Sequence, residues 1–486
     1  MTARRITRIA AGLVSVAAFA GLAGLVALRA PGKRVVLGSV PVGNPSWGPS
    51  WGTANVDSRL GRAFILDDGI LQQQVTLNTG GGYSWSGSNS SNKIHIIDTR
   101  TGRLIKAIDV PQSVRSLAVD TATARVFAFG QGQIQVLDAR SGSTLGTIPF
   151  TGNLNGFNDS IGTSLVDERA GQVFATVDPQ DSNAPLDQHV LVLDGRTGRT
   201  LRDLAFPHGA GITSISPNGS RSTYYGPSLS LTLDARAGHL YVFNTNGQMS
   251  VVDSASGRLL STRRLPVALA GARMDERTGR VFAVTAPPGA VAVGSPRRRQ
   301  PPQSALVMLD PATGAIRTIA PATALFWGGP AATAIAGDSD RVFVLDGTRR
   351  TVDVRDGADG RLVRAVAVDG RPLQIALDGP HHRALVTAFS GYTYATVNER
   401  IAVLDTRTGA LLRTISLGHV GYVLAVDTGT GHLVATYDTM AAAPADRYAW
   451  LPGWLRPRLP WIPPPPPSLG PNQRLLTHMA LTIDPS

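Results

Sequence analysis

The chain contains no cysteine and little lysine among its 486 residues. The absence of cysteine excludes disulfides, thiolate chemistry, cysteine-ligated zinc and lipid attachment at a lipobox cysteine. Charged residues are also scarce, at 16% of the chain, whereas glycine (53 residues) and proline (33 residues) are abundant. This composition is typical of a turn-dense globular protein and favours the all-β class.

The net charge of +12 comes almost wholly from arginine, because lysine occurs only at Lys33, Lys93 and Lys106. A basic protein can bind nucleic acid or an anionic envelope surface. Here the arginines recur at the turn positions of a repeat and do not gather on one segment. We therefore expect no nucleic-acid partner.

A long apolar run follows a basic N-terminus. Arg4, Arg5 and Arg8 precede the stretch from Ile9 to Leu28, whose 20 residues carry no charge. As a helix this stretch is about 30 Å long, enough to span a bilayer. We expect residues 1–30 to form a signal anchor of a single-pass membrane protein, with everything after them outside the cytoplasm. The alternative is a signal peptide cleaved after Ala20, which gives a secreted protein.

One turn motif occurs seven times along the chain. In each copy an apolar strand ends in Asp, variable residues follow, and Gly closes the turn. The copies are Asp98–Gly102, Asp138–Gly142, Asp194–Gly198, Asp253–Gly257, Asp310–Gly314, Asp356–Gly360 and Asp405–Gly409. The Asp side chain can accept hydrogen bonds from the backbone of the turn, and Gly supplies a positive φ. Alternating apolar residues on both sides predict a hairpin at every copy.

A second hairpin precedes each of these turns. It is marked by an Asp and, five residues later, by Arg, Gln or His at the start of a short apolar strand. The pairs are Asp57/Arg62, Asp120/Arg125, Asp167/Gln172, Asp234/His239, Asp275/Arg280, Asp378/Arg383 and Asp427/His432. An eighth copy, before Arg341, has Ala336 at the Asp position. Two hairpins per unit predict a four-stranded antiparallel sheet.

Such a sheet cannot bury both of its faces alone, and radial stacking of the sheets gives a β-propeller. We predict eight blades within residues 33–486, with seven as the alternative, and a Pro/Trp-rich insertion at 440–473. The chain ends in a third strand, Met479 to Asp484, and the segment from Gly32 to Val40 resembles a fourth strand. The last blade should therefore combine both ends of the chain, which closes the ring and leaves no free sheet edge.

The repeats resemble those of the YVTN-type β-propellers found in surface and exported proteins. The stretch Tyr241–Asn244 and the following Val251–Gly257 are the nearest copy. The resemblance covers nearly all of residues 33–484. It implies a propeller outside the cytoplasm, usually of seven blades, and it specifies no activity.

The lengths and aromatic content of the loops predict which end of the ring binds a ligand. First and third turns are short, whereas second turns and the crossings between blades hold nearly all of the length variation and all seven tryptophans. Loops on a rigid scaffold commonly carry function, and exposed aromatics are typical anchors of binding surfaces. We expect a protein, glycan or small organic ligand to bind there. The predicted ligand-binding residues are Trp47, Trp51, Trp85, Trp327, Tyr392, Trp450, Trp454 and Trp461.

The alternative function is an enzyme of the lyase or lactone hydrolase type with its site at the same mouth of the ring. The sequence contains no readable Ser-His-Asp order, His-Glu-x-x-His motif or phosphate loop. We therefore assign no catalytic residue, and we expect neither a metal nor a cofactor.

Export can be tested with fusions after Ser486. A reporter that is active only outside the cytoplasm should work in this position, because the apolar run directs export of all that follows. A reporter that is active only in the cytoplasm should stay silent in the same fusion. Activity of the cytoplasmic reporter would refute export.

Overall fold

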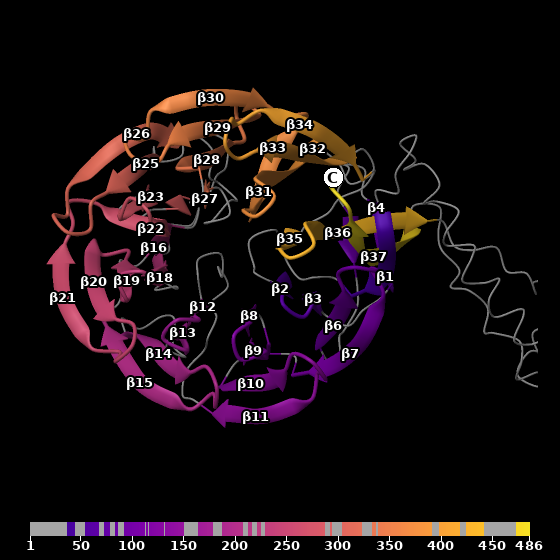
Figure 1. Cartoon of the computed structure of the whole chain (residues 1–486), viewed down its shortest axis with the longest axis horizontal. Helices are drawn as coiled ribbons and strands as arrows, with labels where there is room; N and C mark the ends of the chain where they lie inside the picture. Colours follow the sequence, from indigo (N-terminus) through magenta and orange to yellow (C-terminus); the bar gives the residue numbers. More distant parts are fainter. Residues whose placement is uncertain are drawn as a thin grey trace, which may run out of the picture.

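The computed structural model is a ring of β-sheets around a central opening (Figure 1). It describes residues 36–43, 54–67, 72–77, 83–85, 92–111, 113–114, 116–130, 132–149, 164–177, 187–207, 212–215, 221–224, 229–286, 292–293, 304–322, 333–336, 339–390, 398–417, 424–441 and 473–486. Within these ranges no helix is long and apolar enough to span a membrane. The predicted anchor, residues 1–30, lies outside them.

Eight antiparallel blades, numbered in chain order, make up the ring. Blade 1 contains β2 (Ala54–Asp57), β3 (Arg62–Asp67), β6 (Asn92–Asp98) and β7 (Leu104–Val110); blade 2 contains β8 (Ser116–Asp120), β9 (Arg125–Gly130), β10 (Gln133–Asp138) and β11 (Thr144–Pro149); blade 3 contains β12 (Ser164–Asp167), β13 (Gln172–Val177), β14 (Gln188–Asp194) and β15 (Thr200–Phe206); blade 4 contains β18 (Leu229–Asp234), β19 (His239–Asn244), β20 (Gln248–Asp253) and β21 (Leu259–Arg264). Blade 5 contains β22 (Ala268–Asp275), β23 (Arg280–Ala286), β25 (Ser304–Leu309) and β26 (Ile316–Ala322); blade 6 contains β27 (Thr333–Ala336), β28 (Arg341–Asp346), β29 (Thr351–Asp356) and β30 (Leu362–Ala367); blade 7 contains β31 (Arg371–Asp378), β32 (Arg383–Ser390), β33 (Asn398–Asp405) and β34 (Leu411–Ser416). The first strand of a blade lines the opening and the fourth forms the outer wall (Figure 1).

Blade 8 combines strands from the two ends of the described chain. Its members are β35 (Leu424–Asp427), β36 (His432–Ala441), β37 (Gln473–Ile483) and β1 (Val36–Val42). β1 lies antiparallel to β37, with Val36 opposite Ile483 and Val42 opposite His478. The predicted all-β, eight-bladed propeller of four-stranded antiparallel sheets is thus confirmed, and the seven-bladed alternative is wrong.

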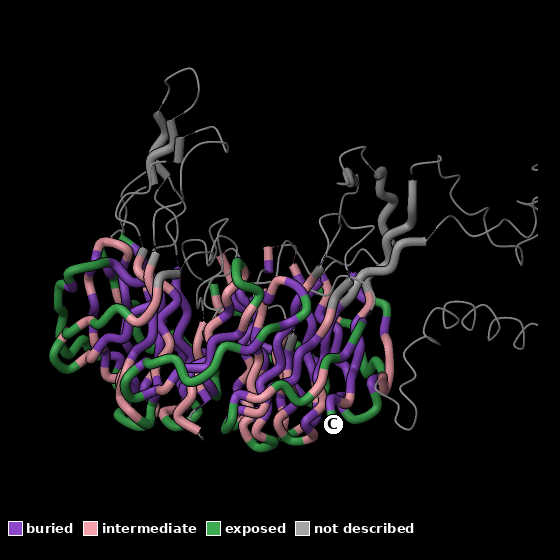
Figure 2. Tube along the Cα trace, turned by 90° about the horizontal axis from the view of Figure 1, so that it is seen from above, coloured by how far each residue is buried: buried purple, intermediate pink, exposed green. Residues whose placement is uncertain are grey.

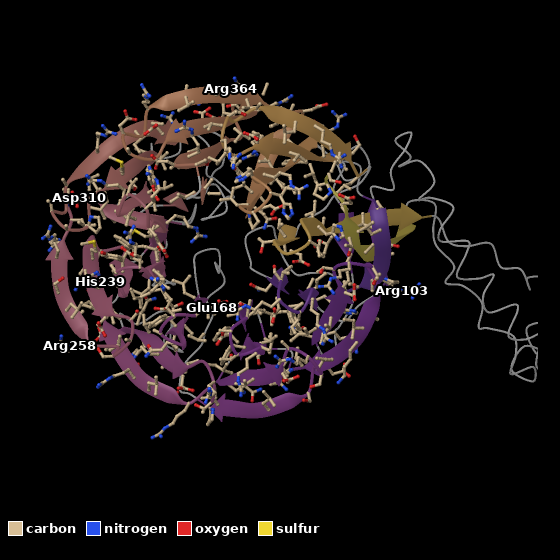
Figure 3. The ribbon with its side chains drawn as sticks, viewed as in Figure 1. Arg103, Glu168, His239, Arg258, Asp310 and Arg364 are labelled. Atoms are coloured by element: carbon tan, nitrogen blue, oxygen red, sulfur yellow. The ribbon has the colours of Figure 1, made fainter. Side chains whose placement is uncertain are left out.

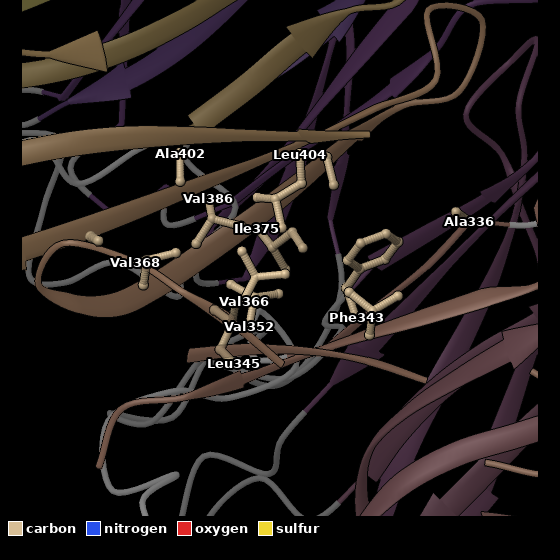
Figure 4. Packing of buried hydrophobic residues seen from close by; sticks show 13 residues of the cluster. Ala336, Phe343, Leu345, Val352, Val366, Val368, Ile375, Val386, Ala402 and Leu404 are labelled. Atoms are coloured by element: carbon tan, nitrogen blue, oxygen red, sulfur yellow. The ribbon is translucent and has the colours of Figure 1, made fainter. Parts of the chain in front are cut away.

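Apolar cores between adjacent blades hold the ring together. Second strands are almost wholly buried, as in β13, whereas the fourth strand β21 is exposed along its whole length. The fully buried phenylalanines include Phe64, Phe127, Phe174, Phe282 and Phe343, all on second strands. Each such side chain contributes about 1.5–3 kcal/mol by leaving water. The core between blades 6 and 7 shows how two neighbouring blades cover each other's facing sides, with thirteen buried residues (Figure 4).

The glycine that closes a third turn also sets the distance between blades. Gly198 has φ 75°, and a Cβ on it would lie 2.9 Å from side-chain carbons of Ile148 and Val136 in the preceding blade. At the junction of blades 8 and 1 two glycines meet. A Cβ on Gly38 would lie 2.6 Å from the carbonyl oxygen of Gly102 and 2.8 Å from its Cα.

Gly38→Ala should lower the free energy of unfolding by about 1–3 kcal/mol, because the new methyl group overlaps backbone atoms that cannot rotate away. Gly146→Ala is the matched control, since Gly146 lies in β11 without a positive φ and its Cβ would meet nothing within 4 Å. The control should change stability by less than about 1 kcal/mol, in the stabilising direction. Denaturant titration measures both, and equal losses would contradict the close approach of β1 to blade 1.

Candidate functional site

The two ends of the ring are built differently. Successive turns of an antiparallel sheet alternate between its ends, so first and third turns share one end, here called the turn face. Second turns and the crossings between blades share the other end, the loop face. In the side view the C-terminus lies at the lower end, which is the turn face (Figure 2).

The second connection of blade 1 adds strands to blade 8 on the loop face. It contains β4 (Gln72–Leu77) and β5 (Tyr83–Trp85). β4 pairs antiparallel with the loop-face half of β37, from Thr76 opposite Gln473 to Gln72 opposite Thr477, and β5 pairs with β4. The insertion therefore joins blades 8 and 1 by backbone hydrogen bonds beyond the ring itself.

A second added sheet lies on the other side of the opening. The crossing from blade 3 to blade 4 forms a hairpin of β16 (Ile212–Ile215) and β17 (Arg221–Tyr224). β24 (Ala292–Val293), from the second connection of blade 5, pairs parallel with β16. β16 and β4 are seen on opposite sides of the opening (Figure 1). The loop face thus carries two added sheets, one on each side of the opening.

The predicted ligand-binding aromatics fall almost entirely outside the described residues. Those outside are Trp47, Trp51, Trp327, Tyr392, Trp450, Trp454 and Trp461. Trp85 alone is placed by its backbone, opposite Val75 at the outer strand of the first added sheet. The fold assigns its connection to the loop face, as expected, and the grouping of these aromatics into one surface stays a prediction.

The repeated aspartates of the third turns are occupied by their own turns. Asp194 Oδ1 accepts from the amides of Arg196 (3.1 Å) and Thr197 (2.6 Å) and from the Thr197 hydroxyl (2.8 Å). The hydroxyl and amide of Thr197 hold the pKa of Asp194 below its ordinary value. A carboxylate that is ionised and saturated with donors is a poor general acid or base at neutral pH. The predicted turn role of these residues is confirmed.

The aspartates of the first turns are buried and face the next blade. Asp427 Oδ2 of blade 8 accepts a hydrogen bond from the Thr99 hydroxyl of blade 1, and both residues are fully buried. Blade 2 has Ala139 at the position of Thr99, and there Asp57 Oδ2 finds no partner within the described ranges. Burial raises the pKa of Asp57. We call the contact at Asp427 the interblade latch.

Between blades 6 and 7 it is the aspartate that is missing, and the threonine hydroxyl is left without an acceptor among the described residues. Ala336 replaces the latch aspartate in blade 6, and Thr406 occupies the position of Thr99 in blade 7. The amide of Thr406 donates to His382 as that of Thr99 donates to Gly61, so the two turns match in geometry. Thr406 is fully buried, and its hydroxyl makes no hydrogen bond in the described part of the chain.

Sequence reasoning missed a buried histidine–aspartate pair in blade 1. His95 Nε2 lies 2.8 Å from Asp67 Oδ2, and the two side chains are 4% and 0% exposed. At the position of His95, the third strands of other blades carry the polar residues Gln135, Ser250 and Asp353 as well as apolar ones such as Leu191 and Val307. Because polar residues recur at this position, no local pattern of the sequence singles out the pair.

A desolvated arginine in β22 was also missed. The register of β22 shifts between Ala270 and Arg273, and the flanking amides of Ala272 and Met274 donate to hydroxyls of blade 4. Burial lowers the pKa of Arg273, and its one hydrogen bond among the described residues goes to the Ala272 carbonyl. The described ranges hold no group of three acidic or histidine side chains that could bind a metal ion.

No family model matches the sequence, and no curated protein does either. Similar solved structures include dihydro-heme d1 dehydrogenase NirN in complex with DHE (TM-score 0.49, 13% identity, covering 84% of this chain and 76% of that one), hydrazine synthase from Kuenenia stuttgartiensis (0.45, 13%, 78% and 99%) and BamB from Moraxella catarrhalis (0.42, 14%, 74% and 92%). At these identities the likeness extends to the fold alone.

The interblade latch can be tested with two identical substitutions. Thr99→Val should cost about 1–3 kcal/mol of unfolding free energy, because the buried carboxylate of Asp427 loses its donor. Thr406→Val removes a buried hydroxyl that has no partner, so it should leave stability within about 0.5 kcal/mol of the parent. Denaturant titrations at neutral pH measure both. Equal losses in the two variants would disprove the latch.

Proposed function

We propose that the protein is a membrane-anchored, extracytoplasmic recognition propeller of the YVTN type, whose loop face binds a protein, a glycan or a small organic ligand. The observation that carries the proposal is the asymmetry of the ring. In the described part of the chain, every strand added to the eight blades belongs to a loop-face connection, namely β4, β5, β16, β17 and β24. A rigid scaffold with its insertions gathered at one end is a common arrangement for binding.

Recognition is favoured over catalysis by the positions of three of the described histidines. A fourth, His189, lies 2.7 Å from Asp203 within blade 3. His432 Nδ1 lies 2.8 Å from the Thr99 carbonyl, and His381 Nδ1 lies 2.8 Å from Asp378 Oδ1. Both are on the turn face, in blades 8 and 7, whereas His95 is buried inside blade 1. A lyase or hydrolase needs such groups to converge around one substrate, and these three serve separate structural contacts.

Closure of the ring by the N-terminal strand belongs to the same proposal. It is supported by the pairing of β1 with β37, by the contact between Gly38 and Gly102, and by the interblade latch from Asp427 to Thr99. Without disulfides, a closed ring protects the sheet edges that an open propeller would leave unpaired. The anchor at residues 1–30 would fix this closed ring to the outer side of the membrane.

The recognition surface can be tested by ligand screening of the full chain in detergent. Glycan, peptide and small-molecule libraries are screened by thermal shift, and hits are measured by calorimetry. Trp85→Ala and Trp327→Ala should each weaken binding at least about tenfold, as expected for aromatic anchors. Arg236→Ala, an exposed residue of a turn-face loop, is the control and should bind as the parent does. Hits that bind both tryptophan variants with unchanged affinity would overturn the proposal.

A further inference from the structure

The polypeptide enters the ring from the turn face. Val36, the first residue of β1, pairs with Ile483, which stands next to the C-terminal residues at the turn face (Figure 2). Only residues 31–35 separate Val36 from the proposed anchor, and five residues span at most about 18 Å. An anchor that ends at residue 30 therefore holds the turn face close to the bilayer and directs the loop face away from it.

The same end of the ring carries a repeated set of exposed apolar side chains. In the described part of the chain, ten of the eleven exposed large hydrophobic residues occupy one place in the repeat, the start of a fourth strand directly after a third turn. They are Leu104, Ile105, Leu145, Leu201, Leu259, Leu260, Leu362, Val363, Leu411 and Leu412, each 40–55% exposed. They come from six blades and follow the outer wall at the turn-face end. Together with the cations described next, they are called the rim.

The rim is also strongly cationic. The four residues after the third-turn glycine, counted over blades 1–7, include nine basic residues and no acidic one. The nine are Arg103, Lys106, Arg199, Arg202, Arg258, Arg317, Arg361, Arg364 and Arg413. The whole chain has 46 basic and 34 acidic residues, so this excess is local. Arg103, Arg258 and Arg364 lie on the outer side of the ring (Figure 3).

Several of these cations contact backbone carbonyls, whereas Arg258 and Arg361 interact with the third-turn carboxylates of Asp253 and Asp356. Lys106 Nζ and Arg202 Nε donate to backbone carbonyls of the next blade at 3.1 Å, and Arg413 donates to the carbonyl of Asp484 at 3.0 Å. Arg361 has a carboxylate nearby, that of Asp359, at 3.9 Å. Acidic groups of the turn face include Glu168 near the opening and the third-turn residue Asp310 on the outer side of the ring (Figure 3). The rim thus combines apolar side chains with a local excess of basic side chains.

We propose that the rim docks on the surface of an anionic bilayer, so that the propeller stands with its turn face on the membrane and its loop face outward. The proposal rests on the anchor included in the proposed function. Leucines that enter the boundary between headgroups and acyl chains, beside arginines that contact the anionic headgroups, are the combination that holds proteins at membrane surfaces. The short connection to the anchor keeps the rim within reach of those headgroups.

The test uses the natural absence of cysteine, which makes every introduced label unique. Leu259→Cys places an environment-sensitive fluorophore on the rim, and Thr348→Cys places it on an exposed second turn of blade 6, on the loop face. The full chain is reconstituted in phosphatidylcholine vesicles with and without phosphatidylglycerol, and spin-labelled lipids serve as quenchers. The label at position 259 should be quenched strongly in the anionic vesicles and less in neutral ones, whereas the label at 348 should not be quenched.

Charge variants test the rim itself. Arg199→Gln combined with Arg258→Gln should reduce quenching at position 259, whereas Arg264→Gln combined with Arg350→Gln, which removes two exposed arginines outside the rim, should not. Equal quenching at positions 259 and 348, quenching only at 348, or none at either would overturn the docking. Flotation of the chain with vesicles at high salt tests the anchor separately from the rim. Ligand binding in detergent tests the proposed recognition function, so each of the three ideas can fail independently of the others.

Discussion

The protein depends on burial of sheet faces between neighbouring blades. A single four-stranded sheet has two apolar faces and cannot cover either of them, so no blade is stable alone. Each core is therefore shared, and Phe343 of blade 6 packs with Val386 of blade 7 in the same cluster. The smallest described core, between blades 5 and 6, contains only Phe282, Met308 and Val342 as buried residues. Stability is thus a property of the ring, and it varies from one junction to the next.

The polar groups of the turns follow from this stacking. Blades that pack face to face bring each first turn against the third turn of the next blade, where no water can solvate a carboxylate. Asp427 meets a hydroxyl there, whereas Asp57 and Thr406 meet none. A buried polar group without a partner costs stability, yet the ring tolerates it because the surrounding apolar cores are large. The repeat therefore specifies geometry more strictly than it specifies polar pairing.

The sequence was sufficient to predict the blades because their signals are local. An Asp and a Gly four residues apart determine a turn such as Asp194–Gly198, and alternating apolar residues determine the flanking strands. Pairing of β4 with β37 could not be predicted, since it joins Thr76 to Gln473 and no local pattern records that contact. The same holds for the His95–Asp67 pair, which depends on two strands meeting in one register. The loop-face aromatics were assigned to a face by strand counting, and that argument does not place their side chains.

Blade 8 imposes an order in time on the making of this protein. β1 is synthesised first among the strands, whereas its partner β37 is synthesised last. Under the proposed closure, β1 stays without its partner β37 until nearly all of the chain between them has been synthesised. Contacts between the two ends of a chain form slowly, and waiting strands are prone to wrong pairing. The proposed closure is therefore a late event, and the rate at which β1 finds β37 would govern how long the chain depends on protection from aggregation.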